Sequence, residues 1–434
     1  MVNRMSQVRS EKSHSEKSYT TPAGNLDGLI YNATVASFDP HISHPYGMLR
    51  SATLGWRHGK IVLLNEDHHV NDINAKTIIN AKGHLVTPGF IDCHTHAVFG
   101  GNRAQEFEWR LQGQSYREIA EAGGGIQHTV EKTRQEEEIT LLEQAKQRLL
   151  RLHRSGVTSV EVKSGYGLNL DTELKMLQVI RALNEKLPIN VVATCLAAHA
   201  LPKDFNGSSD DYIDWVCQDL LPQVKERDLA DAVDVFCESI AFNTEQAARL
   251  FSAAKELGFA VKGHVEQLSQ SGGTDTVCRY HGLSADHIEY ADESQVMAMK
   301  RAGVVGVLLP GAFYYLKEKQ LPPIASMRKH KVPMAIATDL NPGSSPIFSI
   351  THAANMACVL FGLTPEEALQ GITINAAKAL KLEKNHVLAK GVLKVGADAD
   401  FVLWPIKSPV DLVYELPAVE PEKIWINGES SEYL

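Results

Sequence analysis

The sequence predicts an α/β protein, a TIM-like (β/α)8 barrel that carries a small β-sandwich domain built from both chain ends. Residues 89–343 contain eight short apolar runs that alternate with amphipathic helical stretches, which is the length and rhythm of such a barrel. Residues 27–86 and 385–434 are instead rich in short strands and glycine turns. The composition, 44% hydrophobic and 22% charged over 434 residues, is ordinary for a folded protein with room for more than one core.

The two ends of the chain differ in texture from the middle. Residues 1–26 form a polar stretch that we expect to be a disordered extension, since it lacks the apolar segment of a secretory signal and carries Glu11 and Glu16. The string "ATLGWRHGKIVLL" predicts a hairpin around His58 and Gly59, and "KGVLKVGADADFVLWP" has the same texture near the other end. We therefore expect 27–86 and 385–434 to form one small composite β domain around a barrel at 87–384.

Within the barrel, each predicted strand is a short apolar run that ends in a turn. The helix "NTEQAARLFSAAKELG" opens with Asn243 as its cap, and "EEEITLLEQAKQRLLRLHRSG" is another helical segment. A last helix, "LTPEEALQGITINAAKAL", has Thr364, Pro365 and Glu367 in a capping box and leads the chain back to the small domain. A doubly wound sheet is the competing fold, but no glycine-rich phosphate fingerprint opens any helix. The predicted strands cover residues 89–92, 157–165, 189–200, 232–239, 260–267, 283–290, 304–311 and 333–343.

Charge and cysteine content narrow the function classes. The net charge of -9 and the pI near 6.1 argue against nucleic-acid binding, which needs a basic face. No run approaches the roughly 18 consecutive apolar residues of a membrane span. The six cysteines have no CxxC or disulfide-framework spacing, so we expect a cytoplasmic protein. Helices on the outside of a barrel are compatible with a homodimer.

Polar side chains gather where the predicted strands end, which is where barrels carry their active sites. His94 and His96 end the first strand, and residues two apart on a strand face the same way, so both can point at one ion. Three imidazoles and one carboxylate suit Zn²⁺ or Fe with a position left for water. The other polar residues at strand ends are His199, His264 with Gln267 beyond it, His287 and Asp339.

Each of these residues also has a structural interpretation. The HxH pair alone is a weak metal signal, and His264 and His287 could each be a buried histidine satisfied by its neighbours. Asp339 could cap a helix, and His199 could hydrogen-bond its own loop. Their coincidence at the ends of five strands favours a site, because apolar residues would otherwise fill those positions.

These motifs resemble the amidohydrolase superfamily: "PGFIDCHTH" at the first strand, histidines after the fifth and sixth strands and an aspartate after the eighth. The longer strings "HTHAVFGGNRAQEFEWRLQGQSYREIAEAGGGI", "KSGYGL", "AAHALP" and "TDLNPGSSP" are similar to the imidazolonepropionase family within it. The resemblance covers residues 27–430. It implies a metal-dependent hydrolase of histidine catabolism in the barrel at 87–384.

The resemblance also implies residue roles. His94, His96, His264 and Asp339 would bind one Zn²⁺ or Fe³⁺ per subunit. Asp339, His287, His199 and Gln267 would take part in catalysis. Some family members have Glu in place of Gln267 and Thr in place of Ser344; the first change bears on proton transfer. The implied substrate contacts are Arg103, Tyr166, His199, Gln267, Asn341, Gly343 and Ser344.

The substrate that the resemblance implies is 4-imidazolone-5-propanoate, a cyclic amide with a carboxylate. The fourth strand has no lysine that could bridge two metals, so a single metal is favoured. Hydroxide from a metal-activated water would attack the ring carbonyl, and the lactam C–N bond would break to give N-formimidoyl-L-glutamate. Asp339 would carry the proton to the leaving nitrogen, and His287 would hold the water or the oxyanion.

Arg103 suits the propanoate carboxylate because its planar fork pairs with both oxygens. The alternatives are a surface salt bridge with Glu106 or Glu108 for Arg103, and a structural role for Tyr166 in "SGYGL". Two other functions are weighed: a different amidohydrolase, such as another cyclic-amide hydrolase or an aromatic deaminase, and a metal-binding barrel without catalysis. A nucleobase deaminase has no carboxylate for Arg103 to bind, and a purely structural metal site needs no proton shuttle.

Overall fold

A computed structural model describes residues 25–66, 73–114, 118, 124–384, 387–416 and 418–431. All eight predicted barrel strands are present, and they pair in parallel in the order β14-β13-β12-β11-β9-β8-β7-β6. The predicted strand at 260–267 is split into β10 (Ala260–Val261) and β11. The strands are β6 (Phe90–Asp92), β7 (Val157–Lys163), β8 (Asn190–Ala198), β9 (Ala232–Cys237), β11 (Gly263–Val265), β12 (Ser284–His287), β13 (Val305–Leu308) and β14 (Met334–Ile336).

The ends of the first and last strands join and close the barrel. Thr95 and Leu340 form a parallel bridge just beyond β6 and β14. The amide of Asp339 donates to the His94 carbonyl at 3.0 Å, and the amide of His96 donates to the Leu340 carbonyl at 2.8 Å. A doubly wound sheet would leave these two edges apart, so the barrel prediction is confirmed and the competing fold is wrong.

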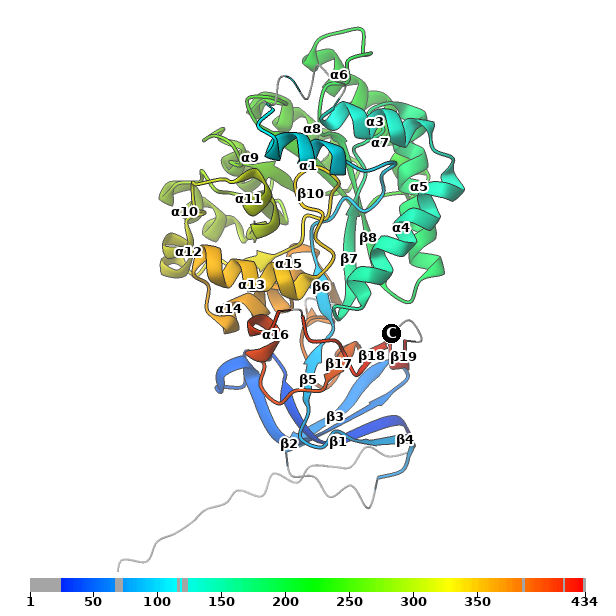
Figure 1. Cartoon of the computed structure of the whole chain (residues 1–434), viewed down its shortest axis with the longest axis vertical. Coiled ribbons are helices and arrows are strands. Elements are labelled where there is room, and N and C mark those ends of the chain that lie inside the picture. The colour runs from blue at the N-terminus through cyan, green and yellow to red at the C-terminus, as the bar shows by residue number, and fades with distance from the viewer. Residues whose placement is uncertain are drawn as a thin grey trace, which may run out of the picture.

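Helices surround the strands and bury their apolar faces against them (Figure 1). The predicted cap of Asn243 is present, since its side chain accepts from the Gln246 amide at 2.9 Å. The larger helices are α1 (Ala104–Leu111), α3 (Ile126–Gln135), α4 (Glu138–His153), α5 (Leu170–Lys186), α8 (Thr244–Glu256), α10 (Glu293–Ala302) and α13 (Ile350–Phe361). The shorter ones are α6 (Ser209–Trp215), the π-helical turn η3 (Val216–Leu220), α7 (Leu221–Glu226), α9 (Gly273–Arg279), α11 (Pro310–Leu316) and α12 (Ile324–His330).

The last predicted helix is two helices, α14 (Pro365–Gly371) and α15 (Ile374–Ala379). The capping box of Thr364 and Glu367 is confirmed. The break falls at Thr373, whose ψ of -101° is not helical and whose hydroxyl donates to the Leu369 carbonyl at 2.6 Å. A threonine side chain that bonds the backbone in this way competes with the helical hydrogen bonds, which explains the break.

A second sheet combines both chain ends below the barrel (Figure 1). β17 pairs antiparallel with β5, so the C-terminal strands continue a sheet begun by the N-terminal ones. The rings of Trp56, Phe401 and Trp425 pack together in its core. Residues 1–24 of the predicted extension lie outside the described residues. The strands are β1 (Leu26–Ala36), β2 (Met48–Arg57), β3 (Lys60–Glu66), β4 (Ala75–Asn80), β5 (Leu85–Pro88), β17 (Phe401–Trp404), β18 (Lys423–Ile426) and β19 (Glu429–Ser430), followed in size by the hairpin of β15 (Glu383–Lys384) and β16 (Val387–Leu388) and the helical turns α16 (Asp411–Tyr414) and η1 (Pro45–Gly47).

The predicted hairpin turn between β2 and β3 is confirmed. Arg57 pairs with Lys60, which leaves His58 and Gly59 as a two-residue loop. Both loop residues have positive φ, 51° and 71°, the signature of the type I′ turn that matches strand twist. Among the described residues, every helix is too short or too polar to cross a bilayer.

Candidate metal centre and active site

Three histidines and one aspartate converge at the carboxyl ends of the strands, where the sequence predicts a metal site. The Nε2 atom of His96 lies 3.3 Å from Nε2 of His94 and 3.4 Å from Nε2 of His264. Oδ1 of Asp339 lies 3.5 Å from Nε2 of His94 and 3.4 Å from Nε2 of His96. We call His94, His96, His264 and Asp339 the ligand cluster.

The donor set of this cluster fits a metal ion. Nδ1 of His94 faces Oδ2 of Asp286 at 2.7 Å, and a carboxylate accepts, so this nitrogen carries the proton and Nε2 keeps its lone pair. Burial lowers the pKa of His94 and of His96 well below the ordinary value, which keeps both rings neutral. Neutral imidazoles that aim lone pairs at one another repel unless a cation lies between them. The three histidines could hold a metal ion.

The structural alternatives for Asp339 and His264 do not account for their positions. The helix after Asp339 begins at Ile350 and is capped by Ser349, so Asp339 caps nothing there. Asp339 has a φ of 51°, a left-handed conformation that costs free energy and concentrates at functional sites. His264 is buried with Nδ1 3.1 Å from Asp234, but its Nε2 belongs to the cluster.

A cavity of about 150 Å³ opens over the ligand cluster and brings most of the predicted site together. Of the predicted residues, His94 lies beneath the cavity and Gly343 lies behind Arg103. Ile126 and Phe236 complete the lining and are absent from the sequence prediction, since apolar residues carry no distinguishing signal there. The predicted residues that line the cavity are His96, Arg103, Tyr166, His199, His264, Gln267, His287, Asp339, Asn341 and Ser344.

Arg103 forms one of its two predicted contacts and lines the cavity. Its Nε and Nη2 donate to the same oxygen of Glu106, at 2.9 and 2.8 Å, so the predicted salt bridge exists. The pair is not a surface pair, because Glu106 is buried and its other oxygen accepts from the Gly125 amide. Arg103 still lines the cavity, and three of its five N–H groups have no acceptor among the described residues.

The turn after β14 shapes the cavity beside Arg103. A Cβ atom on Gly343 would lie 2.1 Å from Nη1 of Arg103, so only glycine leaves room for the guanidinium. The Asn341 amide is occupied within the turn: it donates to the Asp339 carbonyl at 2.7 Å and accepts from the amides of Gly343 and Ser344. In this structure, therefore, Asn341 holds the turn together.

The remaining cavity residues are histidines and a tyrosine. Burial lowers the pKa of His287 and of His199 to about 3 each, so both are neutral near pH 7. Nδ1 of His199 donates to the Gly165 carbonyl at 3.0 Å, and its ring stacks on His96 with centroids 5.5 Å apart. Tyr166 packs against both His96 and His199. His287 has a φ of 80°, so the backbone turns at the end of β12 and aims this side chain into the cavity.

Beneath the ligand cluster lies a set of charged side chains that sequence reasoning missed. The members are wholly buried inside the barrel and bonded to one another. Their sequence signal is charge at alternate positions inside apolar strands, as in "VEVK" and "AVDV", but their pairing depends on strands far apart in sequence. We call Glu161, Lys163, Asp234, Lys262 and Asp286 the charged layer.

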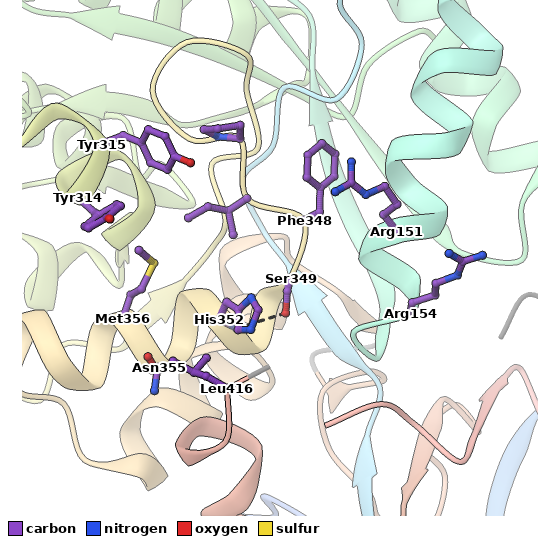
Figure 2. Close-up of a pocket in the computed structure, with 12 residues that line it drawn as sticks. Arg151, Arg154, Tyr314, Tyr315, Phe348, Ser349, His352, Asn355, Met356 and Leu416 are labelled. Carbon is purple, nitrogen blue, oxygen red and sulfur yellow. Dashed lines mark hydrogen bonds between the residues drawn. The ribbon is translucent and has the colours of Figure 1, made fainter. Parts of the chain in front are cut away.

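A larger cavity, of about 740 Å³, is elsewhere and contains none of the ligand cluster. Figure 2 shows it as an outer groove between α4, α11 and α13, with Arg151 and Arg154 facing Tyr314 and Met356 across it. The guanidinium of Arg151 lies 3.4 Å from the ring centre of Phe348. Its lining offers no converging acid–base set, so the small cavity over the ligand cluster is the candidate active site.

Comparison with known proteins agrees with this geometry. The sequence profile described as "Amidohydrolase family" matches residues 85–430. The imidazolonepropionase of Hahella chejuensis is 52% identical over 398 residues, which cover 92% of this chain and 98% of that protein. The imidazolonepropionase of Alteromonas mediterranea is 50% identical over 418 residues, with 93% and 98% covered.

Solved structures with low sequence identity share the fold. A 5-methylcytosine deaminase from Klebsiella pneumoniae, liganded with 5-fluorocytosine, has a TM-score of 0.71 at 17% identity and covers 93% of this chain and 96% of its own. An adenosine deaminase from Xanthomonas campestris with bound zinc has a TM-score of 0.66 at 18% identity, with 94% and 93% covered. The extent of the profile match and the identity to the curated relatives establish the family: this chain belongs to the amidohydrolase family and, within it, to the imidazolonepropionases.

Proposed function

We propose that this enzyme opens the ring of 4-imidazolone-5-propanoate by hydrolysing its lactam C–N bond, which gives N-formimidoyl-L-glutamate. The observation that carries the proposal is the presence of an arginine and a metal-binding cluster in one small cavity, in a chain about 50% identical to imidazolonepropionases. A different amidohydrolase activity would not need Arg103 there, and a scaffold without catalysis would not need the neutral histidines that line the cavity.

His94, His96, His264 and Asp339 are the residues that would hold one metal ion, Zn²⁺ or Fe³⁺. Three imidazoles and a carboxylate suit either ion, and β9 has no lysine to bridge a second one. When bound, the ion acts as a Lewis acid and lowers the pKa of a coordinated water toward neutrality.

Asp339 is placed to move the proton of the reaction. Burial raises the pKa of its carboxyl, against the opposing effect of His287 and His264, so the group is a better base than an exposed aspartate. It takes a proton from the attacking water and returns it to the ring nitrogen when the C–N bond breaks.

His287 and His199 contribute as neutral imidazoles. His287 holds the water or donates to the oxygen that becomes negative as the carbonyl is attacked. The neutral ring of His199 has its proton on Nδ1, bonded to the Gly165 carbonyl, so its Nε2 is an acceptor. That nitrogen suits the N–H of the substrate ring better than its carbonyl. Gln267 and Tyr166 line the same cavity and orient the ring with side-chain donors.

Arg103 binds the propanoate carboxylate with the edge of its fork that Glu106 leaves free. Glu106 uses Nε and Nη2, so Nη1 and the second proton of Nη2 can pair with both substrate oxygens. Gly343 leaves room for this guanidinium, and Ser344 brings a hydroxyl to the cavity.

The test is a direct assay of substrate disappearance. Metal-loaded protein should consume 4-imidazolone-5-propanoate with formation of N-formimidoyl-L-glutamate, followed by absorbance and chromatography. Removal of the metal with a chelator should abolish turnover, and added Zn²⁺ or Fe should restore it; metal analysis of the protein as purified identifies the native ion. Decay of the substrate at its spontaneous rate in the presence of loaded protein would exclude the proposal.

We also propose that the enzyme works in the cytoplasm as a homodimer. All six cysteines are free thiols, as suits a reducing compartment. Large apolar side chains are exposed beside the outer groove, among them Tyr314, Leu416 and Tyr414 at 58%, 62% and 77%. The mass of the protein in solution, measured by light scattering, distinguishes a dimer from a monomer.

A further inference from the structure

The charged layer lies beneath the ligand cluster and contacts it through one hydrogen bond, to His94, and one close carboxylate–imidazole contact, with His264. Nδ1 of His94 faces Asp286 at 2.7 Å, and Nδ1 of His264 faces Asp234 at 3.1 Å. Each carboxylate therefore lies on the far side of a ligand ring from the metal position. Such carboxylates fix the tautomer and the orientation of a ligand histidine.

Two lysines hold these carboxylates in place. Nζ of Lys163 lies 2.7 Å from Asp234, 2.8 Å from Glu161 and 3.8 Å from Asp286. Nζ of Lys262 donates to both oxygens of Glu161 at 2.9 Å and lies 3.7 Å from Asp286. Neither lysine is exposed, so both geometries are fixed by the surrounding atoms.

Lys262 also hydrogen-bonds the backbone segment that carries two of the ligands. Its Nζ donates to the carbonyl of Cys93 at 3.1 Å, which is the peptide directly before His94. Thr95 is held by two hydrogen bonds to β7. Its hydroxyl donates to the Glu161 carbonyl at 2.6 Å, and the Thr95 carbonyl accepts from the Lys163 amide at 2.9 Å. The segment from Cys93 to Thr95 is thus fastened to the charged layer by backbone and side chain.

We propose that Lys262 is a positioning residue for the metal centre, acting on His94 both through the Cys93 peptide and through Asp286. This rests on the metal site proposed above. Lys262 does not touch the metal position or the cavity, since it lies on the opposite side of the ligand rings. Its contribution is to keep the Nε2 atom of His94 aimed at the ion.

The direction in which metal affinity changes when Lys262 is replaced distinguishes positioning from simple electrostatics. Lys262 is a cation beneath a cation site, and like charges repel, so its removal alone would tighten metal binding. Loss of its contacts with Cys93 and Glu161 would loosen the ligand geometry and weaken metal binding. A weaker affinity in a Lys262 variant can therefore come only from lost positioning.

The test is zinc affinity of the apo-protein carrying Lys262→Met, which keeps length and apolar stem and removes the charge and donors. Metal is stripped from the variant and from the wild type, and Zn²⁺ is titrated in competition with a chromophoric chelator. We expect the Kd to rise about tenfold or more. An unchanged or lower Kd overturns the proposal. Failure of the wild type to bind Zn²⁺ would instead overturn the metal site itself.

The matched control is Lys390→Met, in the loop between β16 and β17. Lys390 is also largely buried and pairs with Asp398 and Asp400, far from the ligand cluster. Its loss should lower the melting temperature and leave the zinc Kd unchanged. If Lys262→Met gives no folded apo-protein by circular dichroism, Lys262→Gln decides, because it also removes the charge but keeps a polar side chain: the proposal requires a Kd raised about tenfold or more, and an unchanged or lower Kd overturns it.

Discussion

The ligand cluster and the charged layer are both buried and polar, and the charged layer lies beneath the cluster. They differ in whether their acceptor atoms face a donor. In the charged layer each carboxylate faces a lysine ammonium within 2.7 to 3.8 Å. In the ligand cluster, imidazole lone pairs and a carboxylate face one another, and no described residue places a donor between them. The difference teaches that burial of polar groups does not mark a binding site; convergence of acceptors without a donor does.

The largest expected effect comes from His287→Ala, on the cavity side of this comparison. His287 stabilises the reacting atoms and is not a proposed ligand, so kcat should fall about 100- to 1000-fold while metal content stays the same. Steady-state kinetics and metal analysis check this. His153→Ala is the control, because both ring nitrogens of this buried histidine have partners within the fold. It should lower the melting temperature and leave kcat alone; full activity in His287→Ala would remove this residue from the mechanism.

Arg103→Ala tests the proposed carboxylate contact at the cavity wall. A charge-assisted hydrogen-bond pair contributes about 1.5–3 kcal/mol, so KM should rise roughly 10- to 100-fold, with a smaller change in kcat. Arg110→Ala is the control, because Arg110 donates to the Gly343 carbonyl but does not line the inner cavity. Arg103→Ala with Glu106→Gln removes the stranded carboxylate, and KM should remain high. An unchanged KM in Arg103→Ala would refute the role.

A third prediction concerns stability and not catalysis, and extends the comparison to a buried carboxyl with an unpaired oxygen, Glu289. Burial would raise the pKa of Glu161, but Lys163 and Lys262 outweigh this and lower it. Glu289 is equally buried, its Oε2 has no hydrogen-bond partner among the described residues, and burial raises its pKa to about 8. Pairing, and not burial alone, therefore decides which carboxyl is charged.

Glu289→Gln should make the protein relatively more stable as the pH rises. The folded state keeps the Glu289 proton up to about pH 8, whereas the unfolded chain loses it near its ordinary pKa. The free energy of unfolding of the wild type therefore decreases as the pH rises from the ordinary pKa to about 8. The variant has no proton to lose there, so it lacks this decrease in stability, which is on the order of 1 kcal/mol per pH unit. Melting temperatures of both proteins at pH 5 and pH 8 check this; a difference that does not grow with pH would contradict it.

The sequence predicted the barrel well because each strand is a short apolar run closed by a turn, and because residues such as His94 and His96 end those runs. The strand-end histidines and Asp339 in the cavity lining were predicted for the same reason, whereas Arg103, Tyr166, Asn341 and Ser344 were predicted from the family resemblance. The break at Thr373 was missed, because a threonine hydroxyl bonded to Leu369 leaves no mark in the helical pattern. The charged layer was missed because Lys262 acquires its meaning from Glu161 and Cys93, about 100 and 170 residues earlier in the chain.

Asn341 shows a different limit. Its place in "TDLNPGSSP" resembles a substrate contact, and it does line the cavity. Only the structure reveals that its amide is bonded to Asp339, Gly343 and Ser344, so its substitution disturbs the turn before any ligand. A motif identifies which residues matter, and the hydrogen-bond geometry decides how they matter.

The backbone hydrogen bonds that close the barrel also determine when the site can form. The backbone bonds between His94 and Asp339, and between His96 and Leu340, join the first barrel strand to the last. During synthesis the two leading histidines leave the ribosome long before Asp339 has been translated. The complete ligand cluster can therefore form only after the eighth strand emerges and the barrel closes, so the proposed metal ion would meet all four ligands only late in the synthesis of the chain.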